Sequence, residues 1–393
     1  MGCLLRIAII GTRGIPANYG GFETFAQELG IRLATRGHRV TVYGRSHHVD
    51  PALDGTDHHG VRIRLLPTIR HKYLDTVVHA ALSSIDCVRQ PYDIALMCNA
   101  ANSVFCLLPR WCGIKVVINV DGIERQRRKW NRLGKAYYRF GEWCSVKVAH
   151  VMVADAEVVA AYFRDRYAAR PVVIPYGGDL PRAESQEALA RWGLRPGGYV
   201  LYVSRLEPEN NADVVIRAFR GLETDARLVI VGDAPYADAY KRQLRALAAG
   251  DERIVFTGYQ FGAAYVELRS HAACYVQATE VGGTHPALVE AMGAGRCVIA
   301  NGTPENVEVI GDAGLRYEVN DAEDLRARLR SVLSDAALRG EYGRRAAARV
   351  ARCYAWESVT DRYEALFRGL AGHVETESRG RGKEEMRPRI NQA

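Results

Sequence analysis

The sequence lacks paired redox or metal-binding cysteines, since none of its nine cysteines is spaced C-x-x-C from another. Scattered cysteines in odd number argue against a disulfide framework or a zinc site and favour a reducing cytoplasm.

Long apolar runs are also missing. The best candidate, residues 94–120, is broken by Asn99 and Asn102, so no segment reaches the 18 residues of a membrane span. Glycines cut short the first apolar run, so we expect no signal peptide and a soluble or peripheral protein.

Signatures of dinucleotide and ATP binding are absent as well. The stretch IAIIGTRGIPANYGGFET (residues 7–24) is an apolar run, then glycines, then the start of a helical pattern. Its glycines do not follow G-x-G-x-x-G, it has no G-K-[ST], and the next strand ends in Arg45 instead of an acidic residue. Gly20 and Gly21 nevertheless directly precede the helix, whose free N–H groups attract anions. The stretch predicts an anion-binding turn, with a plain tight turn as the alternative.

No Asp-x-Asp pair occurs, so a diphosphate clamped by a divalent metal has no obvious ligands. The eleven histidines are dispersed. The pairs His47–His48 and His58–His59 fall in predicted loops, where surface residues are expected rather than a zinc site. We therefore predict no bound metal and no cofactor.

Composition and charge indicate a two-domain globular chain with an anionic partner. With 393 residues, 48% hydrophobic and 25% charged, the chain can bury substantial cores. The formal net charge of +8 is unevenly placed, because residues 1–176 carry 24 Lys and Arg against 14 Asp and Glu. A basic first half favours lipid headgroups, a phosphorylated substrate or nucleic acid as the partner.

Short β-branched runs alternate with helical patterns, which predicts parallel strands joined by crossover helices. In the first half we expect strands at 5–10, 39–43, 61–66, 93–98, 115–119, 150–153 and 171–174, and helices at 21–36, 73–89, 132–147 and 156–166. The pattern restarts with a strand and helix within 197–211, followed by strands at 227–231, 253–256, 273–277 and 296–300. The predicted fold class is α/β, with two Rossmann-like doubly wound domains in series.

The stretch TEVGGTHPALVEAMGAG carries a candidate ligand site. Pro286 suits the first turn of a helix, and Gly282 and Gly283 before it let the backbone approach a ligand. Glu290 lies one turn later on the same face, where its carboxylate can bind a ribose diol while the helix terminus holds a diphosphate. Glu280, before the turn, can face a sugar. The alternative is a solvated Glu290, but the apolar pattern around it predicts a buried carboxylate that needs a partner.

The stretch SRLEPENN leaves a strand with Arg205 at its carboxyl end, the edge at which doubly wound sheets bind ligands. A guanidinium there can make two bonds to phosphate oxygens and neutralise charge on a leaving group. The alternative is a surface ion pair with Glu207 or Glu209, which would add little stability.

A basic stretch, DGIERQRRKWNRLGKAYYRFGEW, follows the predicted strand at 115–119. Its first residue, Asp121, lies at the same kind of sheet edge, where it can orient a substrate hydroxyl or cap the next turn. The basic residues and the first aromatic ring of the stretch are Arg125, Arg127, Arg128, Lys129 and Trp130. This interleaving suits docking on an anionic bilayer. No nucleic-acid motif accompanies it, and the alternative is a solvated basic face over core aromatics.

Together these stretches resemble the retaining glycosyltransferases of family 4, which have the GT-B fold, and in particular a bacterial rhamnosyltransferase branch. The resemblance covers roughly residues 5–370 and is carried by GTRGIPANYGGFET, DGIERQRRKW, SRLEPENN and EVGGTHPALVEAMGAG. It implies two Rossmann-like domains that face a central cleft. The implied parts are an acceptor-binding domain at 1–176, a nucleotide-sugar-binding domain at 177–350, a carboxyl-terminal helix at 351–371 that packs back on the first domain, and a disordered tail at 372–393.

By position, the resemblance implies catalytic roles for Arg205, Glu280 and Asp121. The implied donor-binding residues are Gly20, Gly21, Arg205, Asn210, Gly282, Gly283, Thr284 and Glu290. Two positions depart from the family pattern. The first of its two glutamates is expected at Gly282, whereas here Glu280 stands two residues earlier. Its phosphate-binding lysine is replaced by Asn210.

The resemblance also implies a reaction and a setting. The reaction is a metal-independent, retaining transfer of rhamnose from dTDP-rhamnose to a lipid-linked saccharide, in bacterial surface or exopolysaccharide synthesis. The protein would be cytoplasmic, bound peripherally to the anionic inner face of the plasma membrane, and would bind no nucleic acid. Two other interpretations stay open. One is an NADP-dependent oxidoreductase with Arg45 on the 2′-phosphate, and the other is a non-catalytic scaffold that binds a sugar nucleotide.

Overall fold

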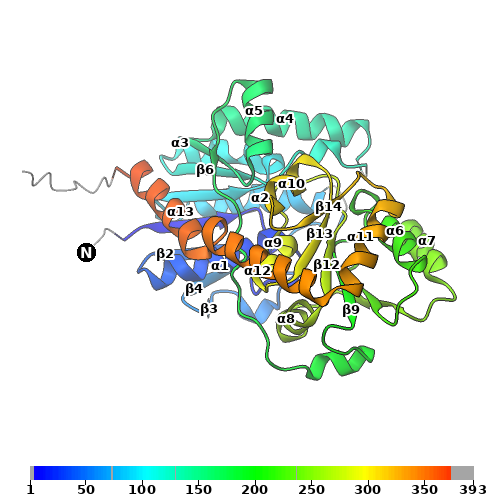
Figure 1. The fold of residues 1–393 in the computed structure, drawn as a ribbon. Helices are drawn as coiled ribbons and strands as arrows, with labels where there is room; N and C mark the ends of the chain where they lie inside the picture. Colours follow the sequence, from blue (N-terminus) through cyan, green and yellow to red (C-terminus); the bar gives the residue numbers. More distant parts are fainter. Residues whose placement is uncertain (1–3, 72–73, 129, 236, 373–393) are drawn as a thin grey trace, which may run out of the picture.

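The structure is a computed structural model that describes residues 4–71, 74–128, 130–235 and 237–372. Lys129 and all but the first residue of the predicted tail lie outside these ranges. The described chain forms two lobes, each an α/β unit built on one sheet (Figure 1).

The sheet of the first lobe is parallel except at one edge, with the order β3-β4-β2-β1-β5-β6-β7-β8. Its strands are β1 (Arg6–Ile10), β2 (Arg39–Arg45), β3 (Asp57–His58), β4 (Val61–Leu66), β5 (Ile94–Cys98), β6 (Lys115–Val120), β7 (Val151–Ala154) and β8 (Val172–Val173). Ile7 and Ile9 of β1 enter one hydrophobic core, and Ala8 and Ile10 enter another. Central strands are therefore covered on both faces, which is why they read as unbroken apolar runs.

The sheet of the second lobe is parallel throughout, with the order β11-β10-β9-β12-β13-β14. Its strands are β9 (Tyr199–Val203), β10 (Arg227–Val231), β11 (Ile254–Gly258), β12 (Cys274–Gln277), β13 (Cys297–Asn301) and β14 (Leu315–Tyr317). This is the 3-2-1-4-5-6 order of a Rossmann unit. The predicted α/β fold class with two Rossmann-like domains is confirmed, although the short strands β3 and β14 were not predicted.

The helices are α1 (Gly21–Thr35), α2 (Leu74–Cys87), α3 (Leu107–Trp111), α4 (Arg132–Val148), α5 (Glu157–Tyr167), α6 (Ala212–Arg220), α7 (Asp238–Ala248), α8 (Gly262–His271), α9 (Pro286–Gly293), α10 (Pro304–Ile310), α11 (Ala322–Ser334), α12 (Ala336–Cys353) and α13 (Trp356–Leu370). Local signals explain several starts: α9 and α10 begin at prolines, and the Asn131 side chain accepts the Gly134 N–H at 2.9 Å to cap α4. No helix among the described residues is both long and apolar enough to cross a membrane.

Two helices occupy the region in which one carboxyl-terminal helix, 351–371, was predicted: α12 ends at Cys353, and α13 begins at Trp356. The second of them, α13, packs on α1 of the first lobe, and Trp356 and Tyr363 are buried in that lobe's core.

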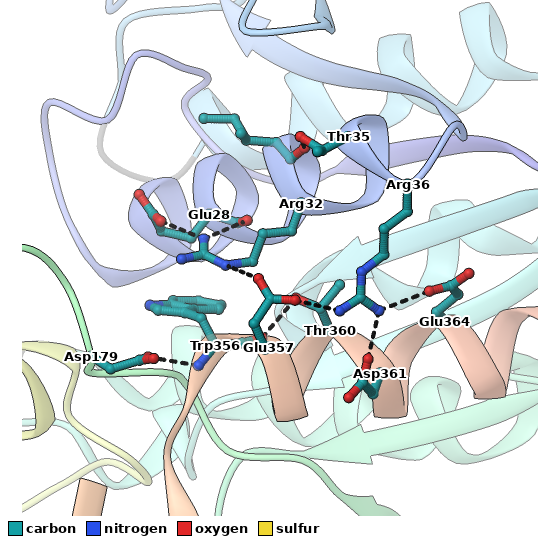
Figure 2. Close-up of polar contacts among 11 residues, drawn as sticks. Glu28, Arg32, Thr35, Arg36, Asp179, Trp356, Glu357, Thr360, Asp361 and Glu364 are labelled. Carbon is teal, nitrogen blue, oxygen red and sulfur yellow. Dashed lines mark hydrogen bonds and ion pairs between the residues drawn. The ribbon is translucent and has the colours of Figure 1, made fainter. Parts of the chain in front are cut away.

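An ion-pair network fastens α13 to α1 (Figure 2). The guanidinium of Arg36 lies 2.5, 2.7 and 2.8 Å from carboxylate oxygens of Glu357, Asp361 and Glu364. Single exposed pairs stabilise little, but several charges that share one guanidinium form a network. The network therefore fixes the position of α1, whose amino end lines a cavity between the lobes.

Candidate active site

A cavity of about 410 Å³ takes its lining from both lobes, and we call it the interlobe cavity. The first lobe contributes Gly20 and Gly21, and the second contributes Arg205, Asn210 and Glu290. The structure thus brings five of the predicted donor-binding residues to one space, whose volume suits a small-molecule ligand.

Two helix amino termini meet at the interlobe cavity. Helix α1 begins at Gly21 and α9 at Pro286. They approach so closely that a Cβ on Gly21 would lie 2.8 Å from Pro286 Cγ. The first turn of a helix has N–H groups without partners inside the helix and carries the positive end of its dipole. An anion at this junction would be attracted by both lobes at once.

Arg205 follows β9 and lies where two cavities meet, because it lines both of them. Its side chain is 29% exposed, and the carboxylate of Glu207 lies 3.8 Å from its Nη1. Burial acts to lower the pKa of Arg205, but nearby acids, including Glu207 and Asp121, outweigh it and raise the pKa. Asn210 donates from Nδ2 to the Arg205 carbonyl at 2.7 Å. It therefore fixes the backbone that carries the guanidinium.

Glu290 lies in α9, is 4% exposed and lines the interlobe cavity. The Tyr265 hydroxyl donates to its Oε2 at 2.6 Å, and Arg269 Nη1 lies 3.5 Å from the same oxygen. Burial raises the pKa of Glu290, although Arg269 and Tyr265 oppose the shift. The prediction of a buried, partnered carboxylate is confirmed. Its Oε1 has no hydrogen bond to any of the described residues.

The turn before α9 is docked into the first lobe and does not face the interlobe cavity. The Thr284 N–H donates to Asp155 Oδ2 at 2.7 Å, and the Thr284 hydroxyl donates to the Asp155 carbonyl at 2.5 Å. A Cβ on Gly283 would lie 2.1 Å from Asp155 Oδ1, so only glycine permits this approach. Gly282, Gly283 and Thr284 line neither cavity. Their predicted position against phosphate and sugar is therefore revised, since they hold the lobes together.

Asp155 is a site residue that the sequence patterns had not singled out. It directly follows β7 and is fully buried. Burial raises the pKa of the Asp155 carboxyl, and the charge of Asp121 raises it further. The signal that could have found it is an acidic residue at the carboxyl end of a parallel strand, the pattern that singled out Asp121.

Gly283→Ala should weaken lobe closure, because the new methyl group overlaps Asp155 Oδ1. Overpacking of this kind costs about 1–3 kcal/mol, so we expect turnover to fall roughly 5- to 150-fold, with a larger radius of gyration in small-angle X-ray scattering. The matched control is Gly369→Ala in α13, where a Cβ meets nothing within 4 Å. Identical behaviour of the two variants would contradict the assigned contact.

Glu280 also lies outside both cavities. Its Oε1 pairs with Arg128 Nη2 of the first lobe at 2.7 Å, and its Oε2 accepts from Asn320 Nδ2 at 2.7 Å. The predicted catalytic role of Glu280 is therefore revised to a contact that bridges the lobes.

A second cavity of about 370 Å³, which we call the first-lobe cavity, adjoins the first and shares Gly20, Gly21 and Arg205 with it. Asp121, at the end of β6, lines it together with Tyr138. Burial and the charge of nearby Glu124 raise the pKa of Asp121 to about 7, against opposing effects of Arg127 and Arg205. A carboxyl from one lobe and a guanidinium from the other thus border the same space.

His47, His48 and Asp75 form one group among the described residues that could hold a metal ion, with ligand atoms within 4.8 Å of one another. The two histidines line the first-lobe cavity, whereas they were predicted on the surface. Burial acts to raise the pKa of Asp75, but His48 and the ion-paired Arg45 lower it to about 2. A divalent cation would compete with Arg45 for this carboxylate. The ion pair with Asp75 also occupies Arg45, the residue that the 2′-phosphate of NADP would need.

The basic stretch that was predicted as a membrane surface is largely engaged in contacts. Its polar contacts are Arg125 Nε to Tyr162 Oη at 2.9 Å, Arg127 Nε to Glu124 Oε1 at 2.6 Å and Arg128 Nη2 to Glu280 Oε1 at 2.7 Å. Arg127 is buried, and Trp130 lines the first-lobe cavity beside Tyr138. Lys129 lies outside the described residues. The predicted surface is corrected at Arg127 and Trp130, which line the cavities, whereas the ion-paired side chain of Arg128 is 60% exposed.

Two Rossmann-like lobes that share an anion-attracting cavity define the GT-B architecture. Residues 19–182 match the family described as Glycosyltransferase Family 4, and residues 190–349 match Glycosyl transferases group 1. The chain belongs to these glycosyltransferases, as the sequence resemblance predicted.

Curated relatives carry related names. O-antigen chain mannosyltransferase B of Escherichia coli is 28% identical over 187 residues, 46% of this chain and 49% of the relative. Phosphatidyl-myo-inositol mannosyltransferase of Mycolicibacterium smegmatis is 29% identical over 228 residues, 56% of this chain and 57% of the relative. The chain thus matches about half the length of these two relatives.

Solved structures share the fold over nearly the whole chain. Sucrose-phosphate synthase from Thermosynechococcus elongatus superposes with a TM-score of 0.79 at 20% identity and covers 94% of this chain and 100% of its own. HepE of Anabaena in complex with UDP-glucose gives 0.75 at 15% identity, with 92% and 99% covered. These similarities establish the GT-B fold.

Proposed function

We propose that this protein is a retaining, metal-independent glycosyltransferase that binds a nucleotide diphosphate sugar in the interlobe cavity. The observation that carries the proposal is the convergence of Arg205 and the amino ends of α1 and α9 on one cavity between the lobes. A diphosphate is the part of such a donor that this arrangement recognises. Glu290, with a free carboxylate oxygen in the same cavity, suits the ribose.

The residues of the two lobes suit charge stabilisation during transfer. As the bond between the anomeric carbon and the diphosphate oxygen breaks, negative charge grows on the leaving group, and Arg205 with the helix termini stabilises it. Asp121 in the first-lobe cavity orients the acceptor hydroxyl and takes its proton as the oxygen bonds to the anomeric carbon. Attack on the same face of the sugar, which gives retention, follows from the family resemblance.

The donor and acceptor are proposed from the resemblance and from the relatives' names. The resemblance favours dTDP-rhamnose, whereas both named relatives are mannosyltransferases. The name of the Mycolicibacterium smegmatis relative includes a lipid, phosphatidyl-myo-inositol. This name supports a lipid-linked saccharide as the acceptor of this chain. The protein would then act as a peripheral enzyme at the inner face of the plasma membrane.

Release of nucleotide diphosphate tests the proposal. The purified protein is incubated with dTDP-rhamnose, GDP-mannose or UDP-glucose, with and without lipid-linked oligosaccharide, in the presence of EDTA. We expect release only with one donor and the acceptor together. An absolute requirement for added metal would contradict the mechanism. Donor binding without turnover on any acceptor would support the scaffold alternative.

The turnover should depend on the protonation of Asp121. Because the pKa of this carboxyl is raised to about 7, it is mostly neutral below pH 6 and ionised above pH 8. Only the ionised form accepts the acceptor's hydroxyl proton, so kcat/KM should rise about tenfold per pH unit below 7 and level off above. In Asp121→Asn the profile should be flat and low. A wild-type inflection that persists in this variant would assign the titration to another group.

A further inference from the structure

Helix α4 carries an exposed stripe of large side chains along its outer face. The exposed positions recur every three or four residues, which places them on one side of the helix. These positions, which we call the α4 stripe, are Arg132, Leu133, Ala136, Arg139, Phe140, Trp143 and Lys147. Leu133 is 80% exposed, Trp143 50% and Phe140 47%. Helix α4 lies at the periphery of the molecule (Figure 1).

The α4 stripe is basic as well as apolar. Arg132, Arg139 and Lys147 are exposed, and Lys135 beside them is exposed too. The acidic residue of α4, Glu142, is buried under two tyrosine hydroxyls at 2.7 and 2.8 Å. The exposed face of the helix therefore has positive charge without a compensating acid on the same helix.

A third aromatic ring lies beyond the carboxyl end of α4. Trp111, the last residue of α3, is 78% exposed. Its neighbour Arg110 donates to the Val148 carbonyl of α4 at 2.6 Å, so the two helix ends adjoin. Phe140 and Trp143 are stacked, with centroids 6.2 Å apart. Such exposed apolar clusters mark interaction sites, and rings among basic residues match the headgroup layer of a bilayer.

The opposite face of α4 borders the first-lobe cavity. Tyr138 of α4 lines it, as does Trp130 immediately before the helix. A helix with its side chains is about 10–12 Å across. The α4 stripe and the proposed acceptor cavity are therefore separated by a single helix.

We infer that the α4 stripe and Trp111 dock on an anionic bilayer, with the rings at the headgroup level and the basic side chains on lipid phosphates. Charge complementarity favours anionic lipid over a second copy of this chain, because two identical basic surfaces repel each other. The inference deepens the proposed function and rests on it in one respect. If the protein transfers a sugar to a lipid-linked acceptor, docking brings that acceptor close to the first-lobe cavity, with only helix α4 between them.

Vesicle co-sedimentation of the full chain tests the docking without requiring transfer. We expect binding to vesicles of phosphatidylcholine with phosphatidylglycerol, weak binding to phosphatidylcholine alone, and a blue shift of tryptophan fluorescence on binding. Phe140→Ala with Trp143→Ala, and separately Arg132→Glu with Arg139→Glu, should each lower the affinity roughly tenfold or more. The matched control replaces exposed residues of the second lobe, Val319→Ala with Arg330→Glu, and should bind like the wild type.

Thermal melting and nucleotide release with a soluble saccharide acceptor keep folding and activity separate from docking. Unchanged melting and release with lost vesicle binding in both stripe variants would establish the surface. Equal vesicle binding by stripe variants and wild type, or no binding to anionic vesicles at all, would overturn it. Wild-type dimers in light scattering that dissociate in the stripe variants would overturn it in favour of a second copy. Absent turnover with intact vesicle binding would reject only the proposed function.

Discussion

Arg205→Ala is expected to lower kcat about 10²- to 10³-fold, with a smaller rise in the KM for the donor. The guanidinium lies where the interlobe and first-lobe cavities meet, and in the proposed mechanism it stabilises the oxygen on which charge grows as the sugar leaves. Removing one such preorganised donor typically costs about 2.7–4 kcal/mol of transition-state stabilisation. Steady-state kinetics of nucleotide release on the preferred donor and acceptor would measure the effect.

Two companion variants make this result specific. Arg205→Lys keeps the charge but loses the planar fork, so it should recover only part of the rate. Arg191→Ala removes an exposed arginine of the same lobe that lines neither cavity and should leave kcat unchanged. Near-normal activity of Arg205→Ala would remove the main electrostatic element of the proposed mechanism.

Glu290→Ala should raise the dissociation constant of the donor roughly 10- to 150-fold and change kcat less. A hydrogen bond to a charged group contributes about 1.5–3 kcal/mol, and this buried carboxylate, with one oxygen left for a ligand, lines the interlobe cavity. The expected loss is in binding, because the ribose is remote from the bond that breaks. Titration calorimetry with the nucleotide diphosphate would measure it without turnover.

The partners of Glu290 call for a control on folding. Arg269 is buried beside this carboxylate, so Glu290→Ala leaves a buried cation with less compensation and should also lower the melting temperature. Tyr265→Phe removes the neutral neighbour that donates to Glu290 and should weaken donor binding only mildly. If Glu290→Ala lost stability but bound the nucleotide normally, the carboxylate would be structural and the ribose would lie elsewhere.

Many of the residues that line the two cavities were predicted from short segments of sequence. The four helices predicted in the first half begin at the predicted residue or one residue later, because their periodicity and starts depend on neighbours within a turn or two. Arg205 and Asp121 were predicted at ligand-binding edges because they follow parallel strands. Glu290 was predicted as buried from its spacing to Pro286 and the apolar residues around it.

The predictions that failed concern contacts between distant segments. Thr284 is hydrogen-bonded to Asp155, 129 residues away, so a turn that looks free to bind a ligand in sequence is occupied by the other lobe. Arg128 is likewise held by Glu280, and Arg127 and Trp130, which were predicted on a membrane surface, line the cavities instead. Helix periodicity, strand edges and the two Rossmann units are local or repeating properties, and residue order alone was enough to predict them. Which residues meet across the cleft depends on how two separately built sheets approach each other, and no short-range pattern encodes that approach.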